Sequence, residues 1–312
     1  MVWALLVACT CAAPPVVPAP AVGTATPSPV APSPVAPSPD APSPDAPSPA
    51  APSPVAPSPD APSTGGVLAT SCEASTIVPW NGGWLVGDNE DKRQLYAYDL
   101  DFTPRGPVSL PAEVDDIEAL ALAGAGYWVV GSHSTNKDGE ARPLRERLLA
   151  PDGTLTPLAL AACPACVAAQ GRAPNAGGFN IEGAAVWDGA LWLGLRAPLA
   201  PDGRAQLLRL DAAGAVTEVA PLDLGGLGVR ELVPDGDGLL VVAGPTTDAD
   251  TAHALYRVAA DRTVTKLGAL PPSTEGVALD PTDPARLVYV TDGDGKPGKC
   301  TAPARWGWIA RP

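Results

Sequence analysis

The sequence predicts an all-β fold, a five-bladed β-propeller closed by an N-terminal strand, and three observations support it. A short phrase containing glutamate recurs at intervals of 44 to 49 residues, with one longer interval of 64. Each copy opens an apolar run, and a polar turn separates that run from a second one. Repeats of this length made of short strands are typical of propeller blades. A spare strand and a pair of distant cysteines then predict how the ring closes.

The chain divides into three parts. Residues 1–26 form a lipoprotein-type signal or anchor region, residues 27–66 a proline-rich stalk, and residues 67–312 the propeller domain. The last part is long enough for one all-β domain with a sizeable core.

The N-terminal region resembles a bacterial lipobox at Leu6-Val7-Ala8-Cys9, in which Cys9 becomes the acylated residue. The apolar stretch is short and no Lys or Arg precedes it, so we expect the true start to lie upstream. The alternative is a chance apolar N-terminus. Thr10 follows Cys9, which by resemblance to lipoprotein sorting signals indicates the outer membrane. We therefore expect an extracytoplasmic protein, either an outer-membrane lipoprotein or a periplasmic or cell-surface one.

The stalk repeats the unit Pro-Ser-Pro-x-Ala, and 19 of the 40 prolines precede residue 66. Such a tract cannot pack a core and is expected to be an extended, polyproline-II-like spacer. At about 3.1 Å per residue it could hold a domain roughly 100 Å from its anchor.

The formal net charge of −14 limits the partners. An acidic domain without basic clusters argues against binding to nucleic acid or to anionic membrane surfaces. We expect a monomer that binds a small molecule or a protein and meets a membrane only through its anchor.

The expected strands alternate with polar turns along the propeller domain, and a spare strand at 67–70 precedes the first blade. Residues 161–178 are an insertion, which explains the long interval; six blades are the alternative if it hides strands. The expected strands are 74–78, 84–87, 94–98 and 107–110 in blade one; 117–122, 127–131, 144–149 and 155–160 in blade two; 181–186, 191–195, 206–211 and 216–220 in blade three; 229–233, 239–243, 254–258 and 263–267 in blade four; and 275–279, 287–291 and 305–310 in blade five.

Blade five is one strand short, and the spare strand supplies what it lacks, which removes open sheet edges. Cys72 ends the spare strand and Cys300 lies just before the strand that it would pair with. We therefore predict a Cys72–Cys300 disulfide that locks the ring. Cys163 and Cys166 form a Cys-x-x-Cys pair, for which we predict a local disulfide; a redox pair or half of a zinc site are the alternatives.

The repeated glutamates are candidates for a metal site, because the first strand of each propeller blade lines the central channel. Crowded carboxylates raise one another's pKa unless a cation compensates, and Ca²⁺ is the natural candidate. Arg196 and Arg230 could supply the counter-charge instead, or the glutamates could only bond backbone groups between blades. The five residues are Glu73, Glu118, Glu182, Glu231 and Glu275.

Turns after the second strands supply a candidate ligand pocket at one mouth of the channel. His133 stands between two serines, but no Gly-x-Ser-x-Gly elbow accompanies it, so a structural or ligand-contacting role is favoured over that of a catalytic base. The candidate ligand-binding residues are Asp88, Ser132, His133, Arg196 and Asp292.

Several motifs in order resemble a bacterial family, domain of unknown function 3616, over about residues 110–295. They include Asp116-Ile117-Glu118-Ala119, Gly131-Ser132-His133-Ser134, Asn180-Ile181-Glu182-Gly183 and Gly194-Leu195-Arg196-Ala197. The resemblance implies a propeller without assigned biochemistry. The family is distantly similar to phytase-like and esterase-like propellers, where activity is calcium-assisted hydrolysis, a link of fold alone.

Three hypotheses about function follow. The first is a lipid-anchored binding module that presents the channel mouth to a ligand or protein. The second is a calcium-dependent hydrolase of phosphate or carboxylic esters, in which Glu118, Glu182 and Glu275 hold the metal while His133 and Arg196 contact substrate. The third is a structural protein of the cell envelope.

Overall fold

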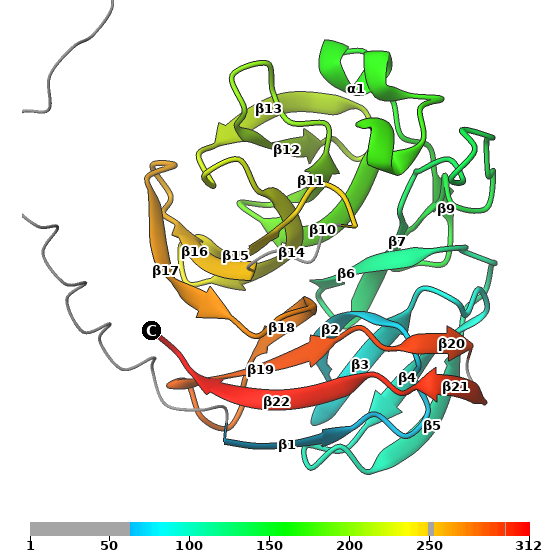
Figure 1. Ribbon diagram of the computed structural model, residues 1–312, viewed down its shortest axis with the longest axis vertical. Helices are drawn as coiled ribbons and strands as arrows, with labels where there is room; N and C mark the ends of the chain where they lie inside the picture. The colour runs from blue at the N-terminus through cyan, green and yellow to red at the C-terminus, as the bar shows by residue number, and fades with distance from the viewer. Residues whose placement is uncertain (1–62, 249–252, 297) are drawn as a thin grey trace, which may run out of the picture. The chain divides into compact units, whose positions relative to one another are not determined.

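The structure is a computed structural model that describes residues 63–248, 253–296 and 298–312. Five four-stranded antiparallel sheets are arranged around a central axis (Figure 1). The innermost strands of neighbouring blades contact one another in a closed circle, β2 to β6, β10, β14, β18 and back to β2. The predicted five-bladed propeller is thus confirmed. The lipobox with Cys9 and most of the proline-rich tract lie outside the described residues.

The blades contain strands in consecutive order, apart from the last one. Blade one has β2 (Ala74–Trp80), β3 (Gly83–Asp88), β4 (Gln94–Tyr98) and β5 (Pro104–Ser109); blade two has β6 (Ile117–Ala123), β7 (Gly126–Gly131), β8 (Leu148–Leu149) and β9 (Leu155–Thr156); blade three has β10 (Asn180–Trp187), β11 (Ala190–Ala197), β12 (Ala205–Leu210) and β13 (Val216–Leu222); blade four has β14 (Gly228–Asp235), β15 (Gly238–Gly244), β16 (His253–Val258) and β17 (Val264–Leu270).

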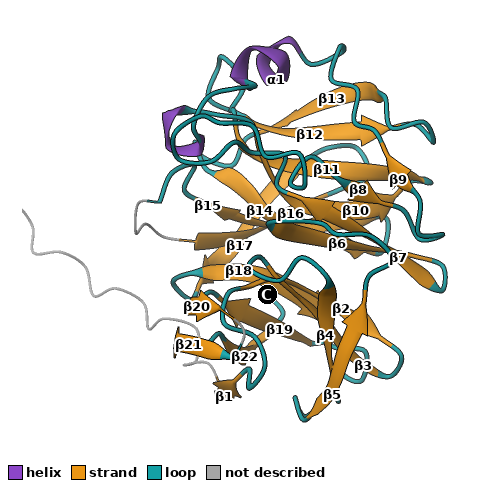
Figure 2. Cartoon of the chain, turned by 90° about the vertical axis from the view of Figure 1, so that its right-hand side faces the viewer, coloured by secondary structure: helices purple, strands orange, loops and turns teal. Residues whose placement is uncertain are grey.

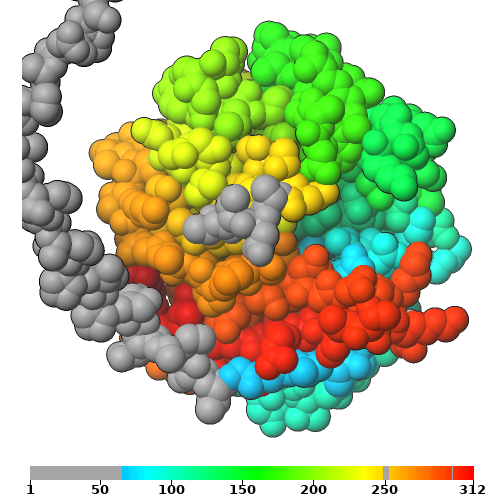
Figure 3. All heavy atoms as spheres, in the orientation of Figure 1, coloured from blue at the N-terminus to red at the C-terminus, as the bar shows by residue number. Residues whose placement is uncertain are grey.

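Blade five is built from both ends of the domain. Its sheet order is β1 (Ser63–Val67), β22 (Arg305–Ala310), β19 (Arg286–Thr291) and β18 (Thr274–Leu279). The blue β1 and the red β22 lie side by side in Figures 1 and 3. Closure by an N-terminal strand is confirmed, and it removes the open edge of the last sheet.

The closing strand begins at Ser63, whereas the sequence placed it at 67–70. The two glycines that indicated a break are part of the strand. A Cβ on Gly65 would lie 2.1 Å from the Trp306 carbonyl oxygen, so only glycine allows β1 to approach β22 this closely. The chain then leaves the sheet, although Leu68 N still donates to the Ala304 carbonyl oxygen at 2.8 Å.

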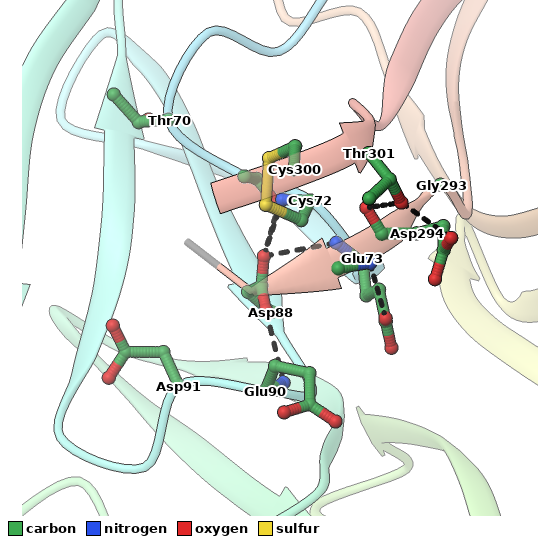
Figure 4. The surroundings of a disulfide bond; sticks show 12 residues. Thr70, Cys72, Glu73, Asp88, Glu90, Asp91, Gly293, Asp294, Cys300 and Thr301 are labelled. Atoms are coloured by element: carbon green, nitrogen blue, oxygen red, sulfur yellow. Dashed lines mark hydrogen bonds between the residues drawn. A yellow bond between two sulfur atoms is a disulfide. The ribbon is translucent and has the colours of Figure 1, made fainter. Parts of the chain in front are cut away.

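Both predicted disulfides are confirmed. Cys72 is bonded to Cys300 across 228 positions, and Cys163 to Cys166. Cys300 lies on β21 (Lys299–Ala302), which forms a small hairpin with β20 (Asp294–Lys296) outside blade five. The long-range disulfide therefore ties this hairpin, and not β22 itself, to the segment that precedes blade one (Figure 4).

Blade two departs most from its predicted strands, because its outer part is largely irregular. Only Leu148–Leu149 and Leu155–Thr156 remain of the strands predicted at 144–149 and 155–160. Ala159 instead forms a parallel bridge with Ala215 of blade three. The insertion contains helical turns, α1 (Pro164–Ala169) and η1 (Pro174–Ala176), shown in purple in Figure 2. Among the described residues it adds no strand, so the six-blade alternative is not supported.

The core consists of apolar layers between adjacent blades. Trp84 and Trp192 are fully buried, and aromatic stacking around Phe102 joins blades one and five. In the described part of the chain, no helix is long and apolar enough to cross a membrane.

Candidate functional site

A β-bulge interrupts the first strand of every blade at the same place. One extra residue stands between pairs that face the second strand, and such bulges re-aim a side chain. The bulges fall between Ala74 and Thr76, Ile117 and Ala119, Ile181 and Gly183, Val229 and Glu231, and Thr274 and Gly276. The extra residues are Ser75, Glu118, Glu182, Arg230 and Glu275.

All five bulge residues line one polar cavity of about 390 Å³ at an end of the central channel. We call this space the mouth cavity. Arg196 of β11 and residues that follow second strands complete its wall, the latter including Asn89, Asp248 and Asp292. The predicted convergence around one axis therefore occurs, but with three glutamates, one arginine and one serine.

Arg230 joins two of the glutamates and is itself buried. Its Nη1 lies 2.8 Å from Glu182 Oε2, and its Nε donates to Glu275 Oε2 at 2.9 Å. Burial lowers the pKa of Arg230, but the carboxylates of Glu182 and Glu275 outweigh this and raise it above its usual value. Arg230 thus supplies the counter-charge between blades three and five.

Glu182 is held from several sides. Its Oε1 accepts hydrogen bonds from Arg196 Nη1 and from Asn180 Nδ2, each at 3.0 Å, in addition to the Arg230 ion pair. Arg196 continues outward and donates to Asp248 Oδ1 at 2.8 Å. Only 3% of Glu182 is exposed, so this carboxylate is a fixed part of the wall.

Glu118 occupies the equivalent position in blade two and has different surroundings. Within residues 63–248, 253–296 and 298–312, its side chain makes neither a hydrogen bond nor an ion pair. Burial raises its pKa well above the usual range, and the charges of Asp116, Glu182 and Glu275 raise it further. Glu118 therefore presents an uncommitted carboxyl group to the mouth cavity.

The next position along each first strand does not line the mouth cavity. Four of these residues are small, and the fifth is Glu231 of blade four. Glu231 Oε2 accepts a hydrogen bond from Thr76 Oγ1 at 2.6 Å, and 1% of the residue is exposed. A Cβ on Gly276 would lie 3.0 Å from Thr76 Cα, so the innermost strands approach one another closely here. The residues at this position are Thr76, Ala119, Gly183, Glu231 and Gly276.

Glu73 and Glu231 do not join the mouth cavity, contrary to the expected ring of five glutamates. Each stands one or two positions away from its bulge. Glu73 accepts a hydrogen bond from Gly295 N at 3.1 Å, beside the β20–β21 hairpin. Burial raises the pKa of Glu231 well above its usual range, which favours a neutral carboxyl group.

The expected calcium site requires six to eight oxygen ligands. Of the three glutamates in the mouth cavity, two are bonded to Arg230, whose guanidinium lies where a cation would balance them. No group of three or more His, Cys, Asp and Glu side chains in the described part of the chain has an arrangement that could hold a metal ion. The described residues do not fit a calcium site, and experiment has to test whether calcium binds.

The candidate ligand-binding residues lie in three places. Arg196 and Asp292 line the mouth cavity. His133 lines a different cavity, described below. Asp88 and Ser132 are fully buried, and neither lines the mouth cavity or the cavity of His133.

Asp88 is a structural residue beside the long-range disulfide. Its Oδ2 accepts hydrogen bonds from Ser71 Oγ and Cys72 N at 2.8 Å and from Glu73 N at 3.1 Å (Figure 4). The residue that lines the cavity in blade one is its neighbour, Asn89.

Asp292 stands at the rim of the mouth cavity. Burial raises its pKa to about 7, and the neighbouring charges of Glu275 and Glu73 act in the same direction. Glu118 and Asp292 are thus carboxyl groups with raised pKa values that face one space.

A side groove of about 400 Å³ continues the mouth cavity over blades two and three. The two spaces share Glu118, Glu182, Arg196 and Asp248. Amide and hydroxyl side chains line part of the rest of the groove, including Ser134, Asn136, Asn175 and Asn180, together with the charged side chains of Asp116, Lys137 and Arg145. Asn175 Nδ2 donates to Asp248 Oδ2 at 2.5 Å, and this bond fixes the outer wall of the side groove.

Ser75, Asn89 and Asp248 were not predicted from the sequence as members of the site, and Arg230 was considered only as a counter-charge. The sequence contains a signal for Ser75 and Arg230. In the three well-formed copies, glutamate is followed by Ala or Gly and then by an apolar residue, as in Glu118-Ala119-Leu120. Ser75-Thr76-Ile77 of blade one has the same pattern of a polar, a small and an apolar residue. It could have been aligned with the other copies by this pattern, without requiring a glutamate.

The family resemblance is confirmed over part of the chain. Residues 173–273 match the family described as Protein of unknown function (DUF3616). This span runs from the insertion through blade four, so it includes Glu182, Arg196 and Arg230. No curated protein sequence matches the chain significantly.

Several solved structures are similar in fold. A glutaminyl cyclase from Myxococcus xanthus is 14% identical with a TM-score of 0.46, and the match covers 80% of this chain and 95% of that one. The Bacteroides ovatus Xyloglucan PUL GH43B is 10% identical with a TM-score of 0.46, covering 72% and 49%. A protein described as a gluconolactonase candidate is 15% identical with a TM-score of 0.43, covering 80% and 93%. Likeness at this level carries no argument about function.

Proposed function

We propose that this propeller is a binding module, and that its mouth cavity takes a small ligand rich in hydrogen-bond donors, such as a primary amine. The observation that carries the proposal is Glu118, a carboxyl group that faces a polar cavity of about 390 Å³ and has no hydrogen-bond or ion-pair partner among the described residues. The volume of this cavity lies within the range of about 300–1,000 Å³ that is usual for small-molecule sites, and its polar groups converge on one space.

The charges of the cavity select the ligand class. The carboxyl groups of Glu118, Glu182, Asp248, Glu275 and Asp292 outnumber the guanidinium groups of Arg196 and Arg230. Both guanidinium groups are already engaged by carboxylates. This excess of carboxyl groups would repel an anionic ligand, whereas an ammonium group would pair with Glu118 and reduce the repulsion.

A binding experiment tests the proposal. Propylamine, propane-1,2-diol and propionate, which differ mainly in their polar group, are titrated into the protein by calorimetry. We expect binding of the amine, weaker binding of the diol and none of propionate. Glu118→Gln should weaken amine binding at least tenfold, while Glu218→Gln, on the outer strand β13, should not change it. Equal binding by both variants, or tighter binding of propionate, would overturn the proposal.

A second candidate function is hydrolysis of a phosphate or carboxylic ester, and Asp292 favours it. A carboxyl group with a pKa of about 7 is suited to general acid–base work at neutral pH. Turnover of p-nitrophenyl acetate or p-nitrophenyl phosphate that falls about 100-fold in Asp292→Asn would support this function. Turnover equal to that of buffer would remove it.

Tethering to the cell envelope through an acylated Cys9 is part of the same proposal. It is supported by the lipobox-like Leu6-Val7-Ala8-Cys9 and by the proline-rich tract. Cells that express the gene with its upstream region should incorporate a palmitate analogue into the protein. Normal labelling of a Cys9→Ala variant would contradict acylation at this residue.

A further inference from the structure

A second cavity, of about 340 Å³, lies between the loops of blade two and the insertion that follows it. We call it the His133 cavity. It shares no residue with the mouth cavity and only Thr135 with the side groove. Its wall includes His133, Thr135, Leu158, Leu160, Arg172 and Phe179.

His133 has a fixed ring with a defined proton position. Its Nδ1 lies 2.9 Å from the Gly131 carbonyl oxygen. Because a carbonyl oxygen only accepts, Nδ1 carries the proton and Nε2 of the neutral ring is an acceptor. Burial lowers the pKa of His133 to about 4, so the ring is neutral at physiological pH.

The backbone at His133 holds the ring in this place. The residue adopts a left-handed conformation with φ of 56°. Its backbone N donates to the Arg145 carbonyl oxygen at 3.1 Å, and the adjacent Ser132 carbonyl oxygen accepts from Ile181 N at 2.8 Å. The first bond lies within blade two, and the second connects blades two and three.

The Nε2 atom of His133 is buried and has no hydrogen-bond partner among the described residues. Native proteins pair the large majority of their buried side-chain polar atoms. The surrounding wall offers little to this acceptor, since Leu158, Leu160 and Phe179 are apolar. A hydrogen-bond donor from outside the chain would give His133 Nε2 a partner.

We propose that the His133 cavity binds a small molecule with an apolar body of about one ring and an O–H or N–H group that donates to His133 Nε2. The apolar body would pack against Leu160 and Phe179, which are 7% and 3% exposed. Both belong to the same core cluster as the disulfide-bonded Cys163 and Cys166, so this wall is rigid. The charged side chains of Glu146 and Arg172 are exposed at the rim.

Phenol is a suitable probe, because it combines one apolar ring with a single donor, and anisole is its matched control without the donor. Protein labelled with ¹⁵N-histidine has only two histidines, His133 and His253, and a His253→Gln variant assigns them. We expect phenol to shift the Nε2 resonance of His133 in a saturable manner. Anisole should bind at least fivefold more weakly.

Two variants separate this site from the mouth cavity. Ala141→Trp places a large side chain into the His133 cavity from an exposed position and should abolish the phenol shift. Glu118→Gln should leave it unchanged. No saturable shift of His133, equal binding of anisole, or an unchanged response in Ala141→Trp would overturn the proposal. These outcomes are independent of amine binding at the mouth.

Discussion

Blades two and three each place a glutamate at the equivalent position of their bulge, yet the two side chains have different surroundings. Glu182 is bonded to Arg196, Arg230 and Asn180, whereas Glu118 has no such partner among the described residues. One residue makes the difference, because blade three has Arg196 near the end of β11 where blade two has the buried Ser132 just after β7. The comparison shows that a repeat can fix the geometry of a site while single residues decide which groups stay available.

The largest effect is expected from Arg230→Met, which removes the counter-charge from both of its glutamates. Breaking a buried ion pair by removing one partner costs about 3–5 kcal/mol of unfolding free energy. Urea denaturation measures the loss, and Arg204→Met at an exposed turn should change stability by less than about 0.5 kcal/mol. A loss below about 1 kcal/mol in Arg230→Met would mean that these glutamates need no counter-charge.

The next effect in size is the difference in stability between Glu182→Gln and Glu118→Gln, which are the same change at equivalent positions of two blades. Glu182→Gln weakens charge-assisted hydrogen bonds of buried groups and should cost about 1–3 kcal/mol. Glu118→Gln removes no hydrogen bond and should not destabilise the fold. Equal losses in the two variants would contradict the distinction between the blades.

The five blades and their closure could be predicted because they rest on apolar periodicity and on cysteine spacing. The composition of the mouth cavity could not be predicted, because a bulge adds one residue to the strand. The side chains beyond it then point to the opposite face of the sheet. Aligning the copies on glutamate therefore selected Glu73 and Glu231 in place of Ser75 and Arg230. Asp88 was chosen from the turn that ends the second strand, where its neighbour Asn89 is the residue that lines the cavity.

The pH dependence of stability sharpens the comparison further. When folding raises the pKa of a carboxyl group, the free energy of unfolding falls as the pH rises. The fall begins near the pKa of the unfolded state, about 4.3, and continues through the pKa of the folded state. The pKa of Glu118 is raised, so Glu118→Gln should gain melting temperature relative to the wild type as pH increases from 4 to 8. A difference that is constant across this range would show that Glu118 titrates normally.

The smallest effect is expected from calcium. A single free carboxyl group binds Ca²⁺ weakly, and a ligand present at its dissociation constant stabilises by only about 0.4 kcal/mol. Melting curves with millimolar Ca²⁺ or with chelator should nearly coincide. Stabilisation of about 2.7 kcal/mol or more, lost in Glu182→Gln, would instead restore the glutamate ring as a metal site.

The closure of blade five has a mechanical consequence. A force applied from the N-terminal side reaches the domain through β1, whose backbone bonds to β22 would be the first to separate. The covalent link between Cys72 and Cys300 stops this peeling a few residues further on. Everything between the two cysteines, which includes the first strand of each blade, is then shielded from the load. A domain that is pulled from its two ends would therefore keep the shape of the mouth cavity and of the His133 cavity.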